Sequence, residues 1–439
     1  MIKPKNAAPY RRVERINVRI WGQFVGAVAL DPGYGIYVFA FDPAFQKKGI
    51  ELSPLQMPLS KAALPFFFPD LPEATFKRLP SMLADALPDD FGNSLIDKFM
   101  AERGVPIGSV TALDRLAYMG QRAMGALEFE PTRGPKTSRP TAIEMGGLVN
   151  AARQAVHGSF DDEDHTSSAL RSIIEVGTSA GGARAKAVIA WQPDTNEMRS
   201  GQFDAPDGFE HWLLKFDGMG PDSELGASQD YGRIEYAYHL MAREAGIQMT
   251  PCRLLTENDR AHFMTQRFDR EGGQTRHHMQ TLCAMAHVDY KKKGTNAYAQ
   301  LFMSIKALGL PASAMAEAFR RMAFNVAGKN CDDHSKNFSF ILREGAPRWD
   351  LAPAYDVTFA HNPVGEWTSQ HLMSVNGKFK DINKADFMAE AERFAIGGAA
   401  DMLKEVDEAI AKWATFAHEA GVDQHVAQHI AKHHISVSR

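Results

Sequence analysis

The chain has 439 residues, of which 44% are hydrophobic and 23% are charged, and its formal net charge at pH 7 is −4. This length predicts more than one packed unit, and the charge excludes a general electrostatic attraction to nucleic acid. The sequence has no run of roughly eighteen apolar residues, so a membrane-spanning helix is not predicted. The basic N-terminal segment lacks the apolar core of a secretory signal. Three widely spaced cysteines form neither a disulfide framework nor a zinc motif, so we expect a cytoplasmic protein.

The N-terminal region is predicted to be rich in β-structure. Residues 15–30 alternate apolar and polar side chains around Gly22, as a β-hairpin does, and residues 34–45 continue the alternation. Residues 73–130 mix helical stretches into this pattern. Two turn-rich or acidic stretches that follow, 130–141 and 158–165, are predicted to be exposed connections.

The middle and the end of the chain show different patterns. Short apolar runs at 211–218 and 260–271 predict strands, and the helical spacing of apolar residues at 231–246 predicts a helix that ends at a glycine. Residues 297–309 and 312–328 give the clearest helices, each again closed by a glycine. The chain beyond about residue 276 is therefore predicted to be mostly helical. The adjacent histidines at 277–278 and 433–434 are predicted to be surface residues.

The strongest chemical signal follows the second of these helices. Transfer of a phosphoryl group from ATP requires a carboxylate near the acceptor hydroxyl and oxygen ligands for Mg²⁺. Asp332 and Asn337 have the Asp-x-x-x-x-Asn spacing of a kinase catalytic loop, whereas Asp333 is one residue too close to Asn337. Asp356 follows after a predicted strand, where a hairpin would return it to Asn337. Taken alone, these residues could also be turn residues that cap a strand.

Two further features suit the same chemistry. Lys215 lies inside an apolar run, and burying a lysine requires an anion, such as ATP phosphates and a helix glutamate, for which Glu235 is the candidate. A lysine that extends to the solvent from an edge strand is the alternative. The loop 177–187 contains Gly181 and Gly182, which would let backbone N–H groups approach phosphates, although an ordinary hairpin loop has the same composition.

Several segments together resemble the HipA family of kinase toxins from type II toxin–antitoxin systems. They occur in the family's order and cover nearly the whole chain: RIWGQFVGAVAL, LPDDFGNSLIDKFMAERG, RLAYMGQRAMGALEFEP, GGARAK, LLKF, IEYAYHLMAREAGI, QRFDR, DDHSKNFS and APAYD. The resemblance implies an α+β fold, a divergent protein-kinase-like two-lobe fold with an added N-terminal β-rich subdomain and a mostly helical C-lobe. The domains would be residues 1–130 for the subdomain, 131–270 for the kinase N-lobe and 271–439 for the C-lobe.

The same resemblance implies roles for individual residues. Asp332 would be the catalytic aspartate, with Asn337 and Asp356 as Mg²⁺ ligands and Ser179 as an autophosphorylation site, next to the alternative Thr178. The implied ATP-binding residues are Gly181, Gly182, Ala183, Arg184, Ala185 and Lys186 over the phosphates, Lys215, then Gln266, Arg267 and Phe268 beside the adenine, and His334, Ser335, Lys336 and Tyr355 on the catalytic side.

The implied function is that of an ATP- and Mg²⁺-dependent serine/threonine protein kinase, the toxin of a HipA/HipB-like pair that inactivates itself by autophosphorylation. Its partners would be a protein substrate and a HipB-like helix-turn-helix antitoxin, with DNA contacted only through that antitoxin and no membrane involved. Two alternatives stay open: a small-molecule phosphotransferase on a similar fold, and a non-catalytic corepressor bound to the antitoxin. The sequence departs from the family pattern at Asp333, where a small residue is more usual, and at residues 276–290, which lack the usual acidic side chains.

Overall fold

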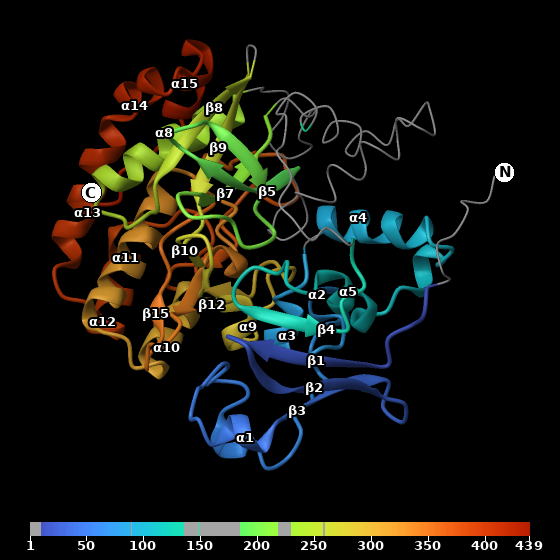
Figure 1. Ribbon diagram of the computed structural model, residues 1–439. Coiled ribbons are helices and arrows are strands. Elements are labelled where there is room, and N and C mark those ends of the chain that lie inside the picture. Colours follow the sequence, from blue (N-terminus) through green and yellow to red (C-terminus); the bar gives the residue numbers. More distant parts are fainter. Residues whose placement is uncertain (1–9, 89, 136–147, 149–184, 218–229, 258–259) are drawn as a thin grey trace. The chain divides into compact units, whose positions relative to one another are not determined.

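The computed structural model describes residues 10–88, 90–135, 148, 185–217, 230–257 and 260–439 (Figure 1). The chain divides into two compact units. The first consists of residues up to 211 together with 269–278, and the second consists of residues 212–268 and 279–439. Each unit is therefore built from segments that are distant in the sequence. The predicted division at residues 130 and 270 stays a prediction.

A four-stranded antiparallel sheet forms the N-terminal part of the first unit, with the strand order β3-β2-β1-β4 (Figure 1). Its strands are β1 (Arg15–Ile20), β2 (Gln23–Asp31), β3 (Ile36–Phe41) and β4 (Leu127–Glu130). Trp21 and Gly22 both have left-handed backbone conformations, with φ of 49° and 69°. Two such residues make the tight turn whose twist suits neighbouring antiparallel strands. The predicted hairpin around Gly22 is confirmed.

Short helices cover the sequence between β3 and β4: α1 (Pro43–Gln46), α2 (Glu73–Phe76), α3 (Ser81–Ala84), α4 (Asp90–Ala101) and α5 (Ala112–Met119), with single 3-10 turns at Leu59–Lys61 and Ile107–Ser109. Helix α5 begins with a capping box, in which Thr111 Oγ1 accepts a hydrogen bond from Asp114 N at 3.1 Å and Asp114 accepts one from Thr111 N at 3.0 Å. The buried Asp114 carboxylate also accepts a hydrogen bond from Val13 N at 3.0 Å. This contact fastens the chain that enters β1 to α5.

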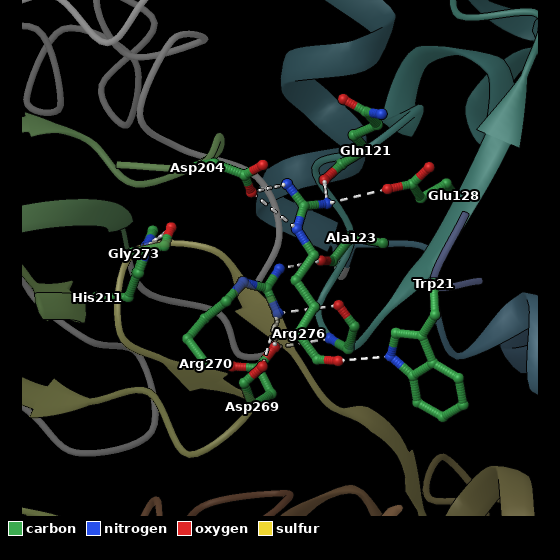
Figure 2. A network of polar contacts seen from close by, with 11 residues as sticks. Trp21, Gln121, Ala123, Glu128, Asp204, His211, Asp269, Arg270, Gly273 and Arg276 are labelled. Atoms are coloured by element: carbon green, nitrogen blue, oxygen red, sulfur yellow. Dashed lines mark hydrogen bonds and ion pairs between the residues drawn. The ribbon is translucent and has the colours of Figure 1, made fainter. Parts of the chain in front are cut away.

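The first unit also contains the hairpin of β5 (Lys186–Gln192) with β6 (Glu197–Ser200), and that of β10 (Arg270–Glu271) with β11 (Thr275–Arg276). Figure 2 shows how the second hairpin is held. The Arg276 guanidinium lies 2.8 Å from Asp204 and 3.7 Å from Glu128, and it donates to Gln121 O at 2.9 Å. Trp21 Nε1 donates to Arg276 O at 2.7 Å. A single arginine therefore joins the turn after β1, strand β4 and the region after β6.

A second arginine of this hairpin is buried beside its own neighbour in the sequence (Figure 2). Arg270 Nη1 donates to the fully buried Asp269 carboxylate at 2.8 Å and to Gly125 O at 2.9 Å. Arg270 Nη2 donates to Ala123 O at 3.3 Å, and Gly125 N donates to Asp269 at 2.7 Å. The paired charges and their backbone partners satisfy each other, so the ion pair can be buried at a tolerable cost.

The second unit begins with a sheet in which β9 (Arg260–Gln266) lies between β7 (Glu210–Lys215) and β8 (Cys252–Glu257), antiparallel to both. The unit boundary falls inside β7. Helix α8 (Tyr231–Glu244) packs against β8 and β9. A Cβ atom on Gly232 would lie 2.0 Å from Ala261 O, so the start of α8 touches the backbone of β9 at a place where only glycine fits.

In the rest of the second unit helices are the predominant regular structure, as predicted, although long segments between them are irregular. Its helices are α9 (Leu282–Ala286), α10 (Tyr298–Ala307), α11 (Ala312–Ala327), α12 (Lys384–Arg393), α13 (Ala399–Ala411), α14 (Trp413–Glu419) and α15 (Gln424–Ala431). Its further strands are β12 (His278–Thr281), β13 (Asn296–Ala297), β14 (Ser339–Leu342), β15 (Asp350–Leu351) and β16 (Met373–Ser374). Strand β14 lies between β12 and β15.

One interpretation of the sequence is wrong. His277 and His278 are buried, with 5% and 1% of their surface exposed, and are not surface residues. His278 Nε2 lies 3.0 Å from Leu52 O. Tertiary packing therefore buries this imidazole, although the sequence pattern alone predicted an exposed histidine. In the described part of the chain, none of the helices has the length and apolar character needed to cross a bilayer.

Candidate active site

Two loops of the second unit run side by side. One connects α11 to β14 and contains residues 328–338, and the other follows β15 and contains residues 352–361. Asn330 and Ala360 form a parallel bridge, and Cys331 N donates to Ala360 O at 2.9 Å. Asn330 Nδ2 lies 3.4 Å from Asp356 O. Residues 332–337 and Asp356, separated in the sequence, are therefore placed on adjoining segments.

Lys215 lies at the end of β7 and is 8% exposed. Its ammonium group contacts two carboxylates, Glu235 on α8 and Asp356 on the second loop. Burial alone would lower the pKa of Lys215, but the charges of Asp356 and Glu235 outweigh it and raise the pKa well above its ordinary value. The strand, the helix and the loop therefore meet at one ammonium group. Lys215 is neither exposed nor an isolated buried charge.

Asp356 also has an unusual backbone. Its φ is 53°, in the left-handed region that most side chains disfavour and that aspartate tolerates better than most. The local strain is small, of the order of 1 kcal/mol, and the Lys215 contact and the neighbouring loop hold the residue in place. The backbone turn at Asp356 directs its carboxylate toward Lys215.

Asn337 closes the first loop. Residues 335–337 form a single 3-10 turn, and Asn337 Nδ2 donates to the backbone oxygen of Asp332 at 2.7 Å. Because the amide nitrogen is used in this way, the amide oxygen is the atom left for another ligand. No hydrogen bond from the described residues reaches that oxygen.

The Asp332 carboxylate is partly accessible, with 42% of its side-chain surface exposed. Trp367 Nε1 donates to Asp332 Oδ1 at 2.9 Å, and His334 Nε2 lies 3.7 Å from the same oxygen. Desolvation raises the pKa of Asp332, the His334 charge and the Trp367 hydrogen bond act against this, and the charges of Asp356 and Asp333 add to the increase. The carboxylate therefore lies in the electrostatic field of Asp356.

Tyr355 ties the two loops together. Its hydroxyl donates to Lys336 O at 2.6 Å and lies 2.5 Å from Ser339 Oγ. Its ring lies 5.7 Å from the ring of Phe268, which follows β9. The Lys336 ammonium lies 5.0 Å from the centre of the Tyr290 ring.

The other predicted site residues divide into four groups. Gln266 and Arg267 lie at the end of β9 and directly after it, and Gln266 N donates to Pro251 O at 2.9 Å. Ser335 is fully buried and its hydroxyl donates to Val288 O at 2.5 Å, a contact that holds the loop. Ala185 and Lys186, at the start of β5, are both buried. The predicted residues that lie outside the described part of the chain are Thr178, Ser179, Gly181, Gly182, Ala183 and Arg184.

No role was predicted for Asp333, yet its carboxylate accepts three hydrogen bonds from outside the loop. The Asp333 side chain is fully buried and accepts hydrogen bonds from Tyr298 Oη at 2.7 Å, His371 Nδ1 at 3.0 Å and Leu372 N at 2.7 Å. Burial would lower the pKa of His371, but the charge of Asp333 overrides it and raises the pKa to about 10. The only sequence signal was the departure from a small residue at this position.

The second ring nitrogen of His371 lies near the thiol of Cys331. His371 Nε2 lies 3.9 Å and His361 Nδ1 3.7 Å from Cys331 Sγ. Burial would raise the pKa of Cys331, and the His371 charge and these contacts instead lower it to about 7. The side chains of Asp333, His371 and Cys331 are all buried and contact one another in that order, and Cys331 and Asp333 flank Asp332 in the sequence.

Comparison with known proteins identifies two domains. Residues 16–130 match the HipA N-terminal domain, and residues 178–435 match the HipA-like C-terminal domain. No curated protein matches the chain. Among solved structures, a chain of the Shewanella oneidensis MR-1 toxin–antitoxin complex of HipA, HipB and its operator DNA matches with a TM-score of 0.65 and 15% identity. That match covers 96% of each chain. The proinflammatory kinase CtkA from Helicobacter pylori matches with a TM-score of 0.34 and 12% identity, over 52% of this chain and 89% of that one.

The match to the Shewanella structure extends over nearly the whole chain and confirms the predicted fold class, a mixed α+β fold with an added N-terminal β-sheet subdomain. The C-terminal domain match alone covers more than half of the 439 residues and contains both loops of the candidate site. With both domains present in order, the chain belongs to the HipA family.

Proposed function

We propose that this chain is an ATP- and Mg²⁺-dependent serine/threonine protein kinase that acts as the toxin of a HipA/HipB-like pair. The observation that carries the proposal is the convergence of Lys215, Glu235 and Asp356 beside the loop that bears Asp332 and Asn337. A buried cation bound to a helix carboxylate and a loop carboxylate is the arrangement that phosphoryl transfer needs at the phosphates of ATP.

The oxygen ligands present fit Mg²⁺. Asn337 has an amide oxygen without a donor among the described residues, and Asp356 supplies a carboxylate. In the same ranges there is no group of three or more His, Cys, Asp or Glu side chains that could hold a metal alone. Mg²⁺ typically takes one or two protein ligands and completes its shell with water and phosphate oxygens. When bound, the ion would neutralise charge on the phosphates.

The residues then have distinct tasks in the transfer. Lys215 would neutralise phosphate oxygens, and Glu235 would hold the lysine in position. Asp332 would accept the proton of a serine or threonine hydroxyl as the hydroxyl oxygen bonds to the γ-phosphorus. The bond from that phosphorus to the bridging oxygen breaks, and ADP leaves with the electron pair. The products are a phosphoester and ADP, and the proton on Asp332 passes to solvent.

The regulatory part of the proposal concerns Ser179, with Thr178 as the neighbouring alternative. A phosphate at Ser179 would add about 1.5 to 2 negative charges to the loop that is proposed to bind ATP phosphates. Repulsion would then weaken ATP binding, so the kinase would inactivate itself. A fully phosphorylated chain that binds ATP as tightly as the unmodified chain would contradict this part.

The antitoxin part rests on the family and on the Shewanella complex, in which HipA occurs with HipB and operator DNA. A small helix-turn-helix partner would bind the DNA, and this chain would be connected to DNA only through that partner. Co-purification of Asp332→Ala with such a partner, together with loss of phosphate transfer, would separate the binding role from the catalytic role.

The decisive experiment incubates purified protein with Mg²⁺ and labelled ATP, followed by intact mass measurement and phosphopeptide mapping. Asp332→Ala is measured in parallel, and serine/threonine peptides are compared with small-molecule alcohols as acceptors. We expect label on the chain and on peptides in the wild type and none in the variant. Transfer only to small molecules would replace the protein-kinase proposal, and failure of the unphosphorylated protein to bind ATP would remove it.

A further inference from the structure

We propose that Trp367 is a positioning residue for Asp332, whose indole N–H fixes one carboxylate oxygen so that the other faces the acceptor hydroxyl. This inference deepens the proposed kinase function and rests on it. Its basis is the contact between Trp367 Nε1 and Asp332 Oδ1 at 2.9 Å. His334 also approaches Oδ1 and no described residue donates a hydrogen bond to Oδ2. The two oxygens of Asp332 therefore have different surroundings.

The segment that carries Trp367 has a defined local shape. Asn362 N donates to Thr368 O at 3.3 Å, and His361 Nδ1 lies 3.2 Å from the same oxygen, so the segment closes on itself. Inside it, Gly365 N donates to Asn362 O at 3.0 Å. These contacts make residues 361–368 a compact loop that presents Trp367 toward Asp332.

A lysine outside this loop adds a second restraint. Lys293 Nζ donates to both the backbone oxygen and the carboxylate of Glu366, each at 2.9 Å. The same ammonium lies 5.6 Å from the centre of the Trp367 ring, within range of a cation–π interaction. Lys293 therefore holds the residue before the tryptophan and also covers the ring.

The neighbouring aspartate anchors the chain just beyond the loop. Asp333 accepts hydrogen bonds from His371 Nδ1 and Leu372 N. Asp332 and Asp333 therefore both bind the segment that carries Trp367, at two separate points. Asp332 contacts the segment at Trp367, and Asp333 contacts it four and five residues later. A small residue at position 333 would leave the second point without its carboxylate. This arrangement explains the unusual Asp-Asp pair, because each aspartate binds a different part of the same segment.

The contact could either orient the Asp332 carboxylate or block its access to the acceptor hydroxyl, and the geometry favours orientation. A carboxylate that receives a proton must present one oxygen to the acceptor in a fixed direction, and an N–H donor on the other oxygen sets its rotation. With 42% of the Asp332 side chain exposed, Trp367 does not cover the carboxylate.

The test compares Trp367→Phe, which keeps an aromatic ring and removes the N–H, with Trp413→Phe as the matched control. Trp413, the first residue of α14, donates through Nε1 to Ala427 O in α15, also at 2.9 Å. Initial rates of transfer from labelled Mg–ATP to the chain itself and to serine/threonine peptides give kcat and the KM for ATP. We expect Trp367→Phe to lower kcat by about tenfold to a hundredfold, the range for loss of one hydrogen bond to a charged group. The KM for ATP should stay within about twofold, and Trp413→Phe should keep kcat while losing thermal stability.

A wild-type kcat in Trp367→Phe would overturn the proposal, and so would a faster variant, because the indole would then be an obstacle. A loss of kcat that Trp413→Phe shares would mean a general structural effect and would also overturn it. The indole N–H resonance of Trp367, assigned from its absence in Trp367→Phe, is measured independently of activity. It should shift in Asp332→Asn, and an unchanged resonance would refute the contact. If the wild type transfers no phosphate, the catalytic role fails together with the proposed function, and the resonance still reports whether the contact exists.

Discussion

Replacing Lys215 by Met would test whether the buried charges at the candidate site act as one unit. The Glu235 side chain is 4% exposed and the Asp356 side chain 23%, so water screens the first contact less than the second. Two unit charges 4 Å apart interact by about 4 kcal/mol at an effective dielectric constant near 20. Removal of one partner from a buried pair usually costs about 3–5 kcal/mol. We therefore expect Lys215→Met to lower the free energy of unfolding by about 4 kcal/mol.

A double-mutant cycle measured by urea unfolding without nucleotide isolates the interaction. Glu235→Gln alone should cost about 1–2 kcal/mol, because Lys215 keeps Asp356 as a partner. The double variant should be more stable than the sum of the single effects predicts, by about 2 kcal/mol, since no lone Glu235 charge remains buried. Lys404 with Asp401, an exposed pair 3.2 Å apart, supplies the control cycle, for which we expect no measurable coupling.

The pH dependence gives a second check on the same cycle. The pKa of Lys215 is raised in the folded chain, so its stabilising effect is complete below its ordinary pKa and is lost only as pH rises through the higher folded value. The coupling energy should therefore be the same at pH 7 and pH 9. Additive single effects within about 0.5 kcal/mol, or a coupling that disappears between these pH values, would refute the reasoning.

Three further predictions follow from the contacts around the two loops. Asp333→Asn removes the larger of the two charges, those of Asp333 and Cys331, that raise the pKa of His371 to about 10, so that pKa should fall; an imidazole titration by NMR that still shows a pKa near 10 would contradict this. Tyr355→Phe removes a hydroxyl that bonds to the backbone beside Asn337, and should lower the free energy of unfolding by about 1–2 kcal/mol while kcat falls; thermal melts and transfer rates check both. Arg321→Met removes both the donor to Ala352 O at 2.9 Å and the ion pair with Glu317 at 2.8 Å, and should destabilise the protein by about 3 kcal/mol in urea; a change below about 1 kcal/mol would show that both contacts are dispensable.

Local sequence patterns predicted the elements whose stability depends on local chemistry. The hairpin around Gly22 forms because two left-handed residues make its turn. Helix α11 ends at residue 327, directly before the predicted glycine, and the spacing from Asp332 to Asn337 corresponds to a real hydrogen bond between the two residues. Lys215 has the buried carboxylate partner on α8 that its apolar surroundings required.

The rest of the candidate site depends on contacts that no local pattern contains. Trp367 meets Asp332 across thirty-five positions, and His371 meets Asp333 across thirty-eight. These residues lie in an irregular segment whose path is set by its own turns and by Lys293, which comes from a third part of the chain. Periodicity carries no information about such a segment. The burial of His278 against Leu52 O has the same origin, since its partner is 226 positions away.

The two consecutive aspartates show why the spacing and the environment favour the same residue for catalysis. Asp333 is fully buried, and both of its oxygens are occupied by donors from three residues. A carboxylate in that position cannot take a proton from an outside hydroxyl without leaving those donors unpaired. Asp332 is 42% exposed, and its one described hydrogen bond engages only Oδ1. For Asp333 to take the place of Asp332, the loop would have to shift by one residue, which would break the hydrogen bond from Asn337 to the Asp332 backbone oxygen. The buried aspartate is therefore the structural anchor, and the exposed one is the candidate for the acceptor's proton.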